Sequence, residues 1–306
     1  MVALAEALIA VEAAVLLGGF LVASISDVRT REVDDRLWQL LGAIGLGIGT
    51  VLVLPGGALA TAVWWLVGLL ALQHLFAWDL RLGGFGERYA DVLELSFYVG
   101  VLVAVALAAA RFGIGASAVP YPALALLVTV LFARGLFELG VLYGGADAKA
   151  LMVAGLLVPV WVAPLFVPGS TAAAFAAVVP FPINLLMDGA LASLAVPIAL
   201  AGRNLARRQF SFARGFTGYA LPVAELPDRF VWVRDPAVPE ARREEAEVET
   251  TAEDRALRVR IAARLRADGV PAVWVTPQIP FLVLLTAGTA LALVAGNLVI
   301  DLLAIL

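Results

Sequence analysis

The stretch Gly144-Gly145-Ala146-Asp147-Ala148-Lys149 places an aspartate and a lysine between two long apolar segments, residues 119–142 and 148–167. A membrane-spanning helix needs roughly 20 mostly apolar residues, and both segments supply them. Ionisable side chains at the edge of a membrane helix are costly to desolvate, so they are candidates for function. The stretch therefore predicts a polytopic membrane protein with a polar site at the end of a helix.

The composition of the whole chain supports this class. Hydrophobic residues make up 62% of the 306 residues and charged residues 15%, and the mean hydropathy is +0.96. Soluble domains carry about 25% charged residues, so this chain lies outside the soluble range. Cysteine is absent and histidine occurs once, at His74. We therefore expect no thiolate catalysis, no metal and no other cofactor. Nucleic acid is not expected as a partner, because the basic residues form no continuous patch.

Eight segments are long and apolar enough to span the bilayer, and they predict an all-α polytopic fold. They cover residues 7–26, 37–55, 58–77, 92–110, 119–142, 148–167, 171–202 and 279–304. Pro180 and Pro182 lie within segment 171–202. Because proline removes a backbone donor and clashes with the preceding turn, they predict a kink there.

The basic residues predict the orientation of the chain in the plasma membrane. With the N-terminus outside, the cytoplasmic connections contain nearly all of the 21 lysines and arginines, as the positive-inside rule requires. Asp27 lies at the end of the first apolar segment. This orientation places Asp27 and Asp147 on the same, cytoplasmic side.

One long connection, residues 203–278, predicts a small α+β subdomain in the cytoplasm. Residues 230–234 and 270–275 have the pattern of short strands. Between them, the spacing of apolar residues from 253 to 267 is typical of an amphipathic helix. The expected organisation is therefore a transmembrane catalytic bundle (1–202), this subdomain (203–278) and a C-terminal transmembrane helix (279–306).

Asp27 and Asp147 each have a structural interpretation and a chemical one. An aspartate in the first turn of a helix is a good N-cap, although Lys149 in the same turn opposes the helix dipole. Asp27 alone is a polar stop at the membrane interface. Together on one side of the membrane, two carboxylates can share a proton, so that one activates a water and the other protonates the substrate. This is the chemistry of aspartic proteolysis, which needs no metal.

The motif Gly144-x-Ala146-Asp147-x-Lys149 resembles the G-x-hydrophobic-D-x-K signature of archaeal prepilin and preflagellin (prearchaellin) peptidases, which are GxGD-type aspartic membrane peptidases. Three further segments are similar to segments of that family: DVRTREVDDRLW (27–38), PFPIN (180–184) and TPQIPF (276–281). The resemblance implies that Asp27 and Asp147 are catalytic. It also implies that the surrounding motif supports them, through Gly144, Gly145, Ala146 and Lys149.

The same resemblance implies a substrate and a place of action. The expected substrates are type IV pilin-like or archaellin precursors, whose N-terminal leader (class III signal peptide) is cleaved at the cytoplasmic membrane face. The chain departs from bacterial relatives at Ala146, where they have glycine, and it lacks their four-cysteine zinc motif and the methyltransferase activity often combined with it. The apolar segments 58–77 and 92–110 account for the long separation of the two aspartates.

Several assignments remain open at the level of the sequence. Lys149 could hydrogen-bond to Asp147 or extend to lipid headgroups. Asp188, one helical turn after Asn184, could join helices or line a substrate path. Arg134 and Glu138 have the spacing of an intrahelical ion pair.

Two other function classes compete with the peptidase. A secondary transporter or channel would use membrane carboxylates to couple protons or cations, and it would show inverted repeats with carboxylates near the bilayer midplane. A non-enzymatic scaffold would use the cytoplasmic subdomain for docking. In a scaffold Asp27 and Asp147 would be dispensable.

Overall fold

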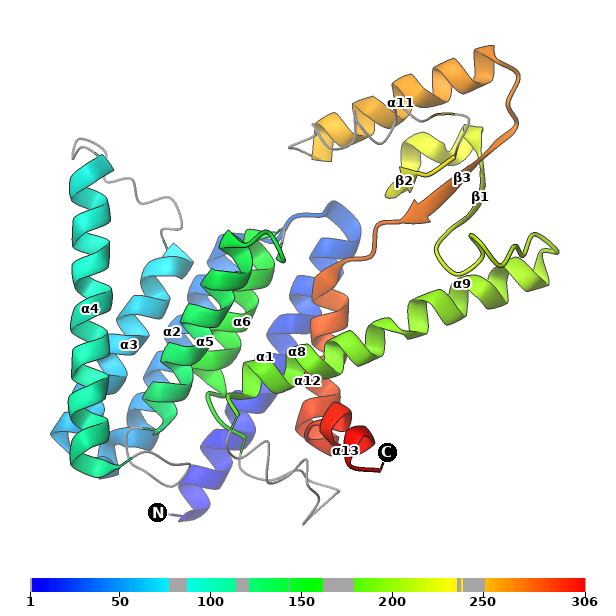
Figure 1. The fold of residues 1–306 in the computed structure, drawn as a ribbon. Coiled ribbons are helices and arrows are strands. Elements are labelled where there is room, and N and C mark those ends of the chain that lie inside the picture. The colour runs from blue at the N-terminus through cyan, green and yellow to red at the C-terminus, as the bar shows by residue number, and fades with distance from the viewer. Residues whose placement is uncertain are drawn as a thin grey trace. The chain divides into compact units, whose positions relative to one another are not determined.

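The computed structural model describes residues 2–76, 87–113, 121–142, 144–161, 179–235, 238 and 251–305 (Figure 1). The chain forms two compact units. Unit 1 consists of Met1–Leu191 together with Phe281–Leu306, and unit 2 of Ala192–Pro280. Unit 1 is helical, whereas unit 2 also contains a small sheet.

Six helices in the described part of the chain are long and apolar enough to cross a membrane. They are Ala3–Thr30, Asp35–Gly56, Ala58–Phe76, Leu95–Phe112, Tyr121–Glu138 and Phe181–Ala206. Six of the eight predicted segments correspond to these helices. The other two, 148–167 and 279–304, differ from the expectation.

The described part of unit 1 consists of α-helices and one short 3₁₀ turn. They are α1 (Val2–Thr30), α2 (Asp35–Val53), α3 (Ala58–Phe76), α4 (Glu87–Phe112), α5 (Tyr121–Glu138), α6 (Gly145–Leu157), α8 (Phe181–Ser193), α12 (Phe281–Ala295) and α13 (Leu298–Ile305), with a short 3₁₀ turn η1 (Leu54–Gly56) between α2 and α3.

Helix α6 is shorter than the segment 148–167 predicted. It has 13 residues and ends at Leu157. Val158 leaves the helix because it precedes Pro159, and a residue before proline disfavours the helical conformation. At 1.5 Å of rise per residue, α6 is about 20 Å long. Residues 162–167 of the predicted segment lie outside the described residues.

The C-terminal segment 279–304 is divided into two helices, α12 and α13. Gly296 has a φ of +84°, a left-handed conformation that ends a helix and favours glycine. Asn297 then starts α13, because its side-chain oxygen accepts a hydrogen bond of 3.1 Å from the N–H of Ile300. The single transmembrane helix expected here is therefore interrupted.

The kink predicted at Pro180 and Pro182 falls at the start of the described helix α8, which begins at Phe181. Pro182 lies in the first turn of α8, where proline is tolerated. Helical hydrogen bonding is irregular at Leu194, between α8 and α9 (Ala195–Ala206). Pro197 explains it, since a proline cannot donate to the carbonyl of Ser193 and its ring clashes with that carbonyl. Residues 171–178 lie outside the described residues.

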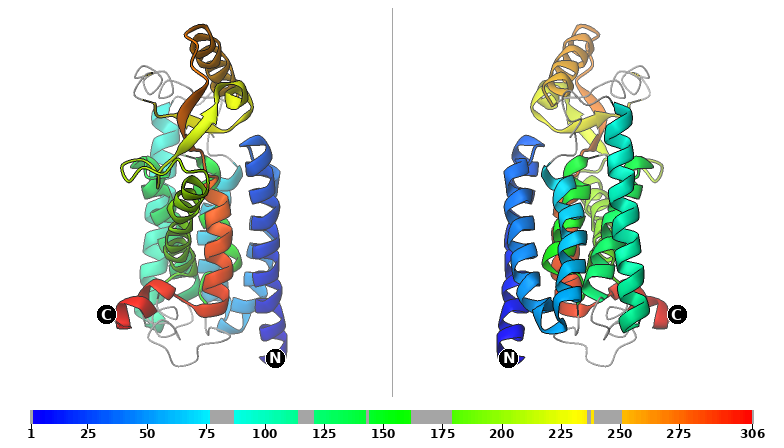
Figure 2. Two further views of the ribbon diagram at one scale, coloured as in Figure 1. Left: turned by 90° about the vertical axis from the view of Figure 1, so that its right-hand side faces the viewer. Right: turned by 90° about the vertical axis from the view of Figure 1, so that its left-hand side faces the viewer.

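The core of unit 1 surrounds α6. From Ala148 to Leu157 every residue of this helix is buried. Helix α2 packs against α3 and α6, α5 packs against α6, and α4 packs against α3 (Figures 1 and 2). The approach of α2 to α6 is close at Gly45, where an added Cβ would lie 2.8 Å from the carbonyl carbon of Leu156.

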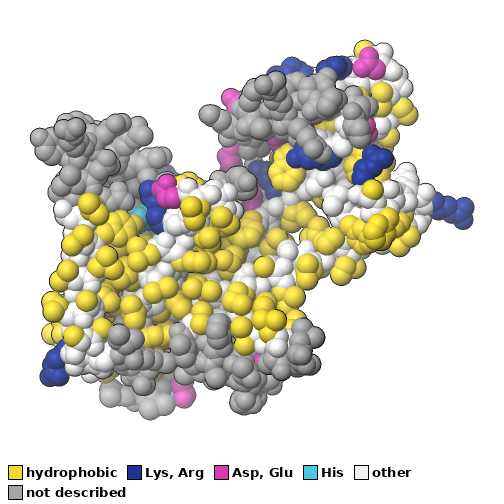
Figure 3. Space-filling model, in the orientation of Figure 1, with side chains coloured by type: hydrophobic (Ala, Val, Ile, Leu, Met, Phe, Trp, Pro, Cys, Tyr) yellow, Lys and Arg dark blue, Asp and Glu magenta, His cyan; other side chains and the backbone are white. Residues whose placement is uncertain are grey.

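The outer surface of unit 1 is apolar. Figure 3 shows hydrophobic side chains over the helices of this unit, and many are large and exposed. Examples are Val22 on α1, at 56% exposure, and Leu107 on α4, at 65%. An exposed apolar surface of this kind suits contact with lipid acyl chains. The description as a membrane protein rests on these helices and on this surface.

The described residues of unit 2 form α9, three strands and one further long helix. Its elements after α9 are β1 (Tyr219–Pro222), η2 (Val223–Asp228), β2 (Val231–Val233), α11 (Thr251–Ala267) and β3 (Ala272–Pro277). The sheet has the order β1-β3-β2, and β3 pairs antiparallel with both neighbours. Leu257, Ile261 and Leu265 of α11 are buried in a core shared with the strands.

The secondary structure predicted for unit 2 is confirmed at three places. Strand β2 lies within 230–234, α11 covers 253–267, and β3 overlaps 270–275. Asp268 and Gly269 follow α11, and Gly269 has a φ of +72°. Strand β1 was not predicted, because its four residues, Tyr-Ala-Leu-Pro, are too few to show an alternating pattern.

Candidate active site

Asp27 lies in the last turn of α1, and its surroundings are ordered by local hydrogen bonds. The N–H of Arg31 donates to the carbonyl of Asp27 at 3.0 Å, with Arg31 at a φ of +61°. The hydroxyls of Ser26 and Thr30 both donate to the carbonyl of Glu32, at 2.8 and 3.0 Å. These bonds fix the four-residue connection to α2, and so the end of α1 on which Asp27 stands.

The carboxylate of Asp27 also has a partner on a distant part of the chain. It accepts a hydrogen bond from the backbone N–H of Leu282, in the first turn of α12. About one helical turn away in unit 1, the hydroxyls of Ser24 and Thr286 are 2.7 Å apart. Asp27 is therefore more than a polar stop, since it also satisfies a backbone donor at the start of α12.

Asp147 lies in the first turn of α6, next to the glycine that starts this helix. Gly144 is the N-cap residue and the N–H of Asp147 donates to its carbonyl at 3.1 Å. The carboxylate folds back over this glycine: a Cβ added to Gly144 would lie 3.0 Å from Asp147 Oδ2. An added Cβ on Gly145, by contrast, would meet no atom within 4 Å. The two glycines of the motif thus have different roles.

The two aspartates, distant in the sequence, are brought together in unit 1. Helices α1 and α6 are in contact. The charge of Asp27 acts on Asp147, and both side chains are only partly exposed.

Lys149 does not bond to Asp147, nor does it extend to the surface. Its Nζ lies 2.6 Å from Oδ1 of Asp35, the first residue of α2, and its side chain is only 9% exposed. Residues two apart in a helix point in directions about 200° apart, so Lys149 faces α2 while Asp147 faces away from it. Both roles considered from the sequence are replaced by an interhelical ion pair.

Three further ionisable residues have partners within unit 1. Arg134 and Glu138 form the expected ion pair on α5. His74 is buried, and its ring nitrogens bond to the carbonyl of Leu70 at 2.8 Å and to the hydroxyl of Tyr98 at 2.7 Å. His74 thus links α3 to α4. In the part of the chain that the structure describes, no three metal-ligating side chains come together.

A second polar cluster lies at the break between α12 and α13. Asn297 donates to Asn184 Oδ1 at 2.8 Å, and the N–H of Leu298 donates to Asp188 Oδ1 at 3.0 Å. All three side chains are buried. Asn184 and Asp188 therefore join α8 to the interrupted C-terminal helix.

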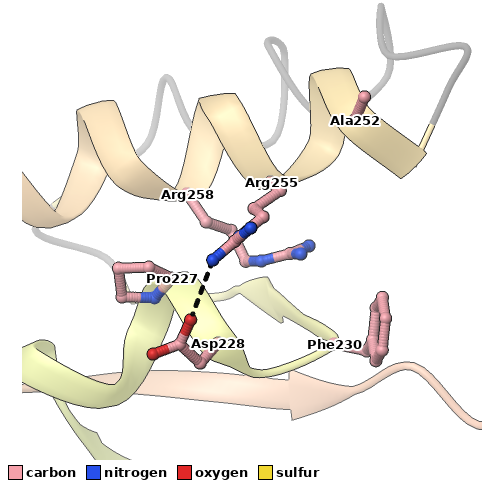
Figure 4. A pocket seen from close by; sticks show the side chains of 6 residues that line it. All are labelled: Pro227, Asp228, Phe230, Ala252, Arg255 and Arg258. Carbon is pink, nitrogen blue, oxygen red and sulfur yellow. Dashed lines mark hydrogen bonds and ion pairs between the residues drawn. The ribbon is translucent and has the colours of Figure 1, made fainter. Parts of the chain in front are cut away.

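Unit 2 has an open pocket of about 490 Å³, lined by residues of this unit (Figure 4). Arg255 reaches across it to Asp228 at 3.4 Å, and Arg258 pairs with Asp254 beside the ring of Phe230. The remaining lining comes from Pro227 and Ala252. Because each arginine has a carboxylate partner, the charges at the pocket cancel, and no charged ligand is favoured.

The sequence could not identify the partners of the site residues. Leu282, Ser24 and Thr286 lie outside the segments quoted above. Asp35 lies within segment 27–38, but nothing in that segment pairs it with Lys149. One signal was present: Lys149 is the only lysine in the chain. A single lysine among arginines, in an apolar helix, indicates a specific acidic partner.

No protein-family model matches the chain, and no curated protein matches it either.

Proposed function

We propose that the protein is an aspartic endopeptidase of the membrane in which Asp27 and Asp147 form the catalytic pair. The observation that carries the proposal is the convergence of these two side chains from the end of α1 and the start of α6, close enough for one charge to act on the other. Helix ends at the membrane edge are also accessible to water, which the reaction consumes.

The surroundings of the two carboxylates favour different roles for them. Arg31 and the N–H of Leu282 partly offset the cost of burying a negative charge on Asp27. Burial, and after it the negative charge of Asp27, favours a proton on Asp147. We therefore assign Asp27 as the general base and Asp147 as the general acid.

Hydrolysis with this assignment proceeds in two steps. Water attacks the scissile carbonyl carbon, giving its proton to Asp27, while the proton of Asp147 passes to the carbonyl oxygen. The tetrahedral intermediate then loses its amine. Asp27 gives its proton to the leaving nitrogen as the C–N bond breaks, and a hydroxyl of the intermediate returns a proton to Asp147. Both carboxyls recover their starting states.

The substrate class comes from the resemblance of the motifs to prepilin and preflagellin peptidases. We propose type IV pilin-like or archaellin precursors, cleaved between a short leader and the hydrophobic helix that follows it. The apolar surface of unit 1 suits such a helix. With the N-terminus outside, the two aspartates act at the cytoplasmic face of the plasma membrane.

The test is cleavage of a precursor by the full chain in proteoliposomes. Asp27→Asn and Asp147→Asn should each abolish cleavage, because an amide can neither take a proton from water nor donate one as a carboxylic acid does. Glu138→Gln is the matched control, since it neutralises a carboxylate that pairs with Arg134. Activity in either aspartate variant would exclude this catalytic pair.

A second candidate function, a transporter, is favoured by one observation. Broken helices with buried polar side chains form the ion sites of many secondary transporters, and α12–α13 is broken beside Asn184, Asp188 and Asn297. Proton or sodium flux into proteoliposomes that is lost in Asp188→Asn and kept in Asp147→Asn would support this function over the peptidase.

A further inference from the structure

We propose that the Lys149–Asp35 ion pair is a positioning device, which fixes the start of α6 against α2 and thereby holds Asp147 opposite Asp27. The inference rests on the proposed peptidase function, because the position of Asp147 matters only if Asp147 reacts. Neither Lys149 nor Asp35 touches the reacting atoms in this account.

The burial of Lys149 requires a specific partner. An ammonium group removed from water must be paired, and a cation near the N-terminus of a helix is also repelled by the helix dipole. Asp35 satisfies the group at 2.6 Å. Asp35 itself is 57% exposed, so the pair lies at the edge of the membrane unit and not in its interior.

The ion pair is one of several contacts between α2 and α6. Another is the close contact at Gly45 with the backbone of Leu156, seven residues after Lys149. Two attachments separated by about two helical turns prevent α6 from sliding or tilting along α2. The start of α6, and with it Asp147, then has a defined position.

The connection between α1 and α2 completes the frame. Only residues 31–34 separate the two helices. Asp34 caps α2 by accepting from the N–H of Arg36 at 2.9 Å. The α1–α2 hairpin thus presents two acidic side chains to α6: Asp27 acts on Asp147 and Asp35 binds Lys149. Removing the ion pair of Asp35 with Lys149 should therefore allow Asp147 to move relative to Asp27.

Enzyme kinetics test the pair. Lys149→Met and Asp35→Asn should each lower kcat about 100-fold while KM changes less than about threefold, as displacement of a catalytic group by about 1 Å predicts. Asp34→Asn is the matched control, because it removes the neighbouring charge from the same turn and asparagine still caps the helix. Its kcat should equal that of the unaltered protein.

Exchange of the two charges tests whether the residues act together. The double variant Asp35→Lys with Lys149→Asp should recover kcat to within about tenfold of the unaltered protein, well above either single variant. Lys149→Arg should retain most of kcat, because a guanidinium can still pair with Asp35.

A readout without catalysis uses the absence of cysteine from the chain. Ala150 and Ala154 on α6 are both 0% exposed, and Leu139 is 79% exposed. A cysteine at 150 should react with a water-soluble maleimide at least about tenfold faster in the Asp35→Asn background, because the first turn of α6 detaches. Cysteines at 154 and 139 should react at unchanged rates, slow and fast respectively.

The outcomes separate this inference from the function on which it rests. Full activity of Lys149→Met and Asp35→Asn, with Asp27→Asn and Asp147→Asn inactive, would overturn the positioning device alone. Loss of activity in Lys149→Met but not in Asp35→Asn would also overturn it, since Lys149 would then act without Asp35. Activity in Asp147→Asn would instead remove the peptidase itself.

Discussion

The backbone N–H of Leu282, at the start of α12, donates a hydrogen bond to the carboxylate of Asp27, near the end of α1. One proposed catalytic side chain is therefore also a structural cap for a helix that begins more than 250 residues later. The two roles can be separated, because an amide oxygen accepts a hydrogen bond but cannot act as a general base.

The cap predicts a difference in stability between two inactive variants. Asp27→Asn keeps an acceptor for Leu282, whereas Asp27→Ala removes it, so the alanine variant should be less stable by about 1 kcal/mol. Thermal unfolding of both purified variants in the same detergent measures this difference. Equal stability would mean that the Leu282 bond contributes nothing to the fold.

The two glycines of the motif should respond differently to alanine. At Gly144 the new methyl group would lie 3.0 Å from Asp147 Oδ2 and displace the carboxylate, so kcat should fall about tenfold. At Gly145 the position is open, and alanine should leave kcat unchanged while stabilising α6 by about 0.5–1 kcal/mol. Parallel kinetics of the two variants test this, and a larger loss at Gly145 would contradict the geometry.

The close approach of α2 to α6 predicts a second matched pair. Gly45→Ala would place a methyl group 2.8 Å from the backbone of Leu156, which cannot rotate away, so the free energy of unfolding should fall by about 1–3 kcal/mol. Gly47 lies on the same helix with no atom near its added Cβ, and Gly47→Ala should stabilise by up to about 1 kcal/mol. Chemical unfolding in mixed micelles compares them, and an unaffected Gly45 variant would rule out the contact.

The hydroxyl contact between α1 and α12 should be measurable as a coupling. Ser24 Oγ and Thr286 Oγ1 are 2.7 Å apart and buried. In a double-mutant cycle of Ser24→Ala and Thr286→Val, we expect a coupling energy of about 0.6 kcal/mol, as for other buried hydrogen bonds between membrane helices. Strictly additive effects of the two changes would show that the contact does not join the helices.

The sequence could predict the elements that depend on composition and periodicity. Long apolar segments gave α1 to α5 within a few residues, and the spacing of Leu257, Ile261 and Leu265 gave α11. Helix ends inside apolar segments were harder, because they depend on single residues. Gly296 divides the C-terminal segment by its backbone conformation, and Pro159 ends α6 through the residue before it.

The site shows a similar division. Asp27 and Asp147 were predicted as site residues because charge at a membrane helix end is unusual and because a motif surrounds Asp147, and their catalytic role stays a prediction. Their neighbours were not, since Asp35 and Leu282 lie on other helices and acquire meaning only through the tertiary fold. Lys149 was expected to bond to Asp147 or to extend to lipid headgroups, but it is buried against Asp35. No local sequence pattern encodes this partner.

The sole lysine of the chain makes the protein a natural reporter of its own dynamics. Acylating reagents that attack primary amines have one side-chain target, and that amine is shielded by its ion pair with Asp35. Mass spectrometry of the peptide that contains Lys149 can therefore follow how often α6 separates from α2, from the rate at which the acyl mass increment appears on that residue. Substrate that holds α6 against α2 would slow this modification, and no substitution in the chain is needed to observe it.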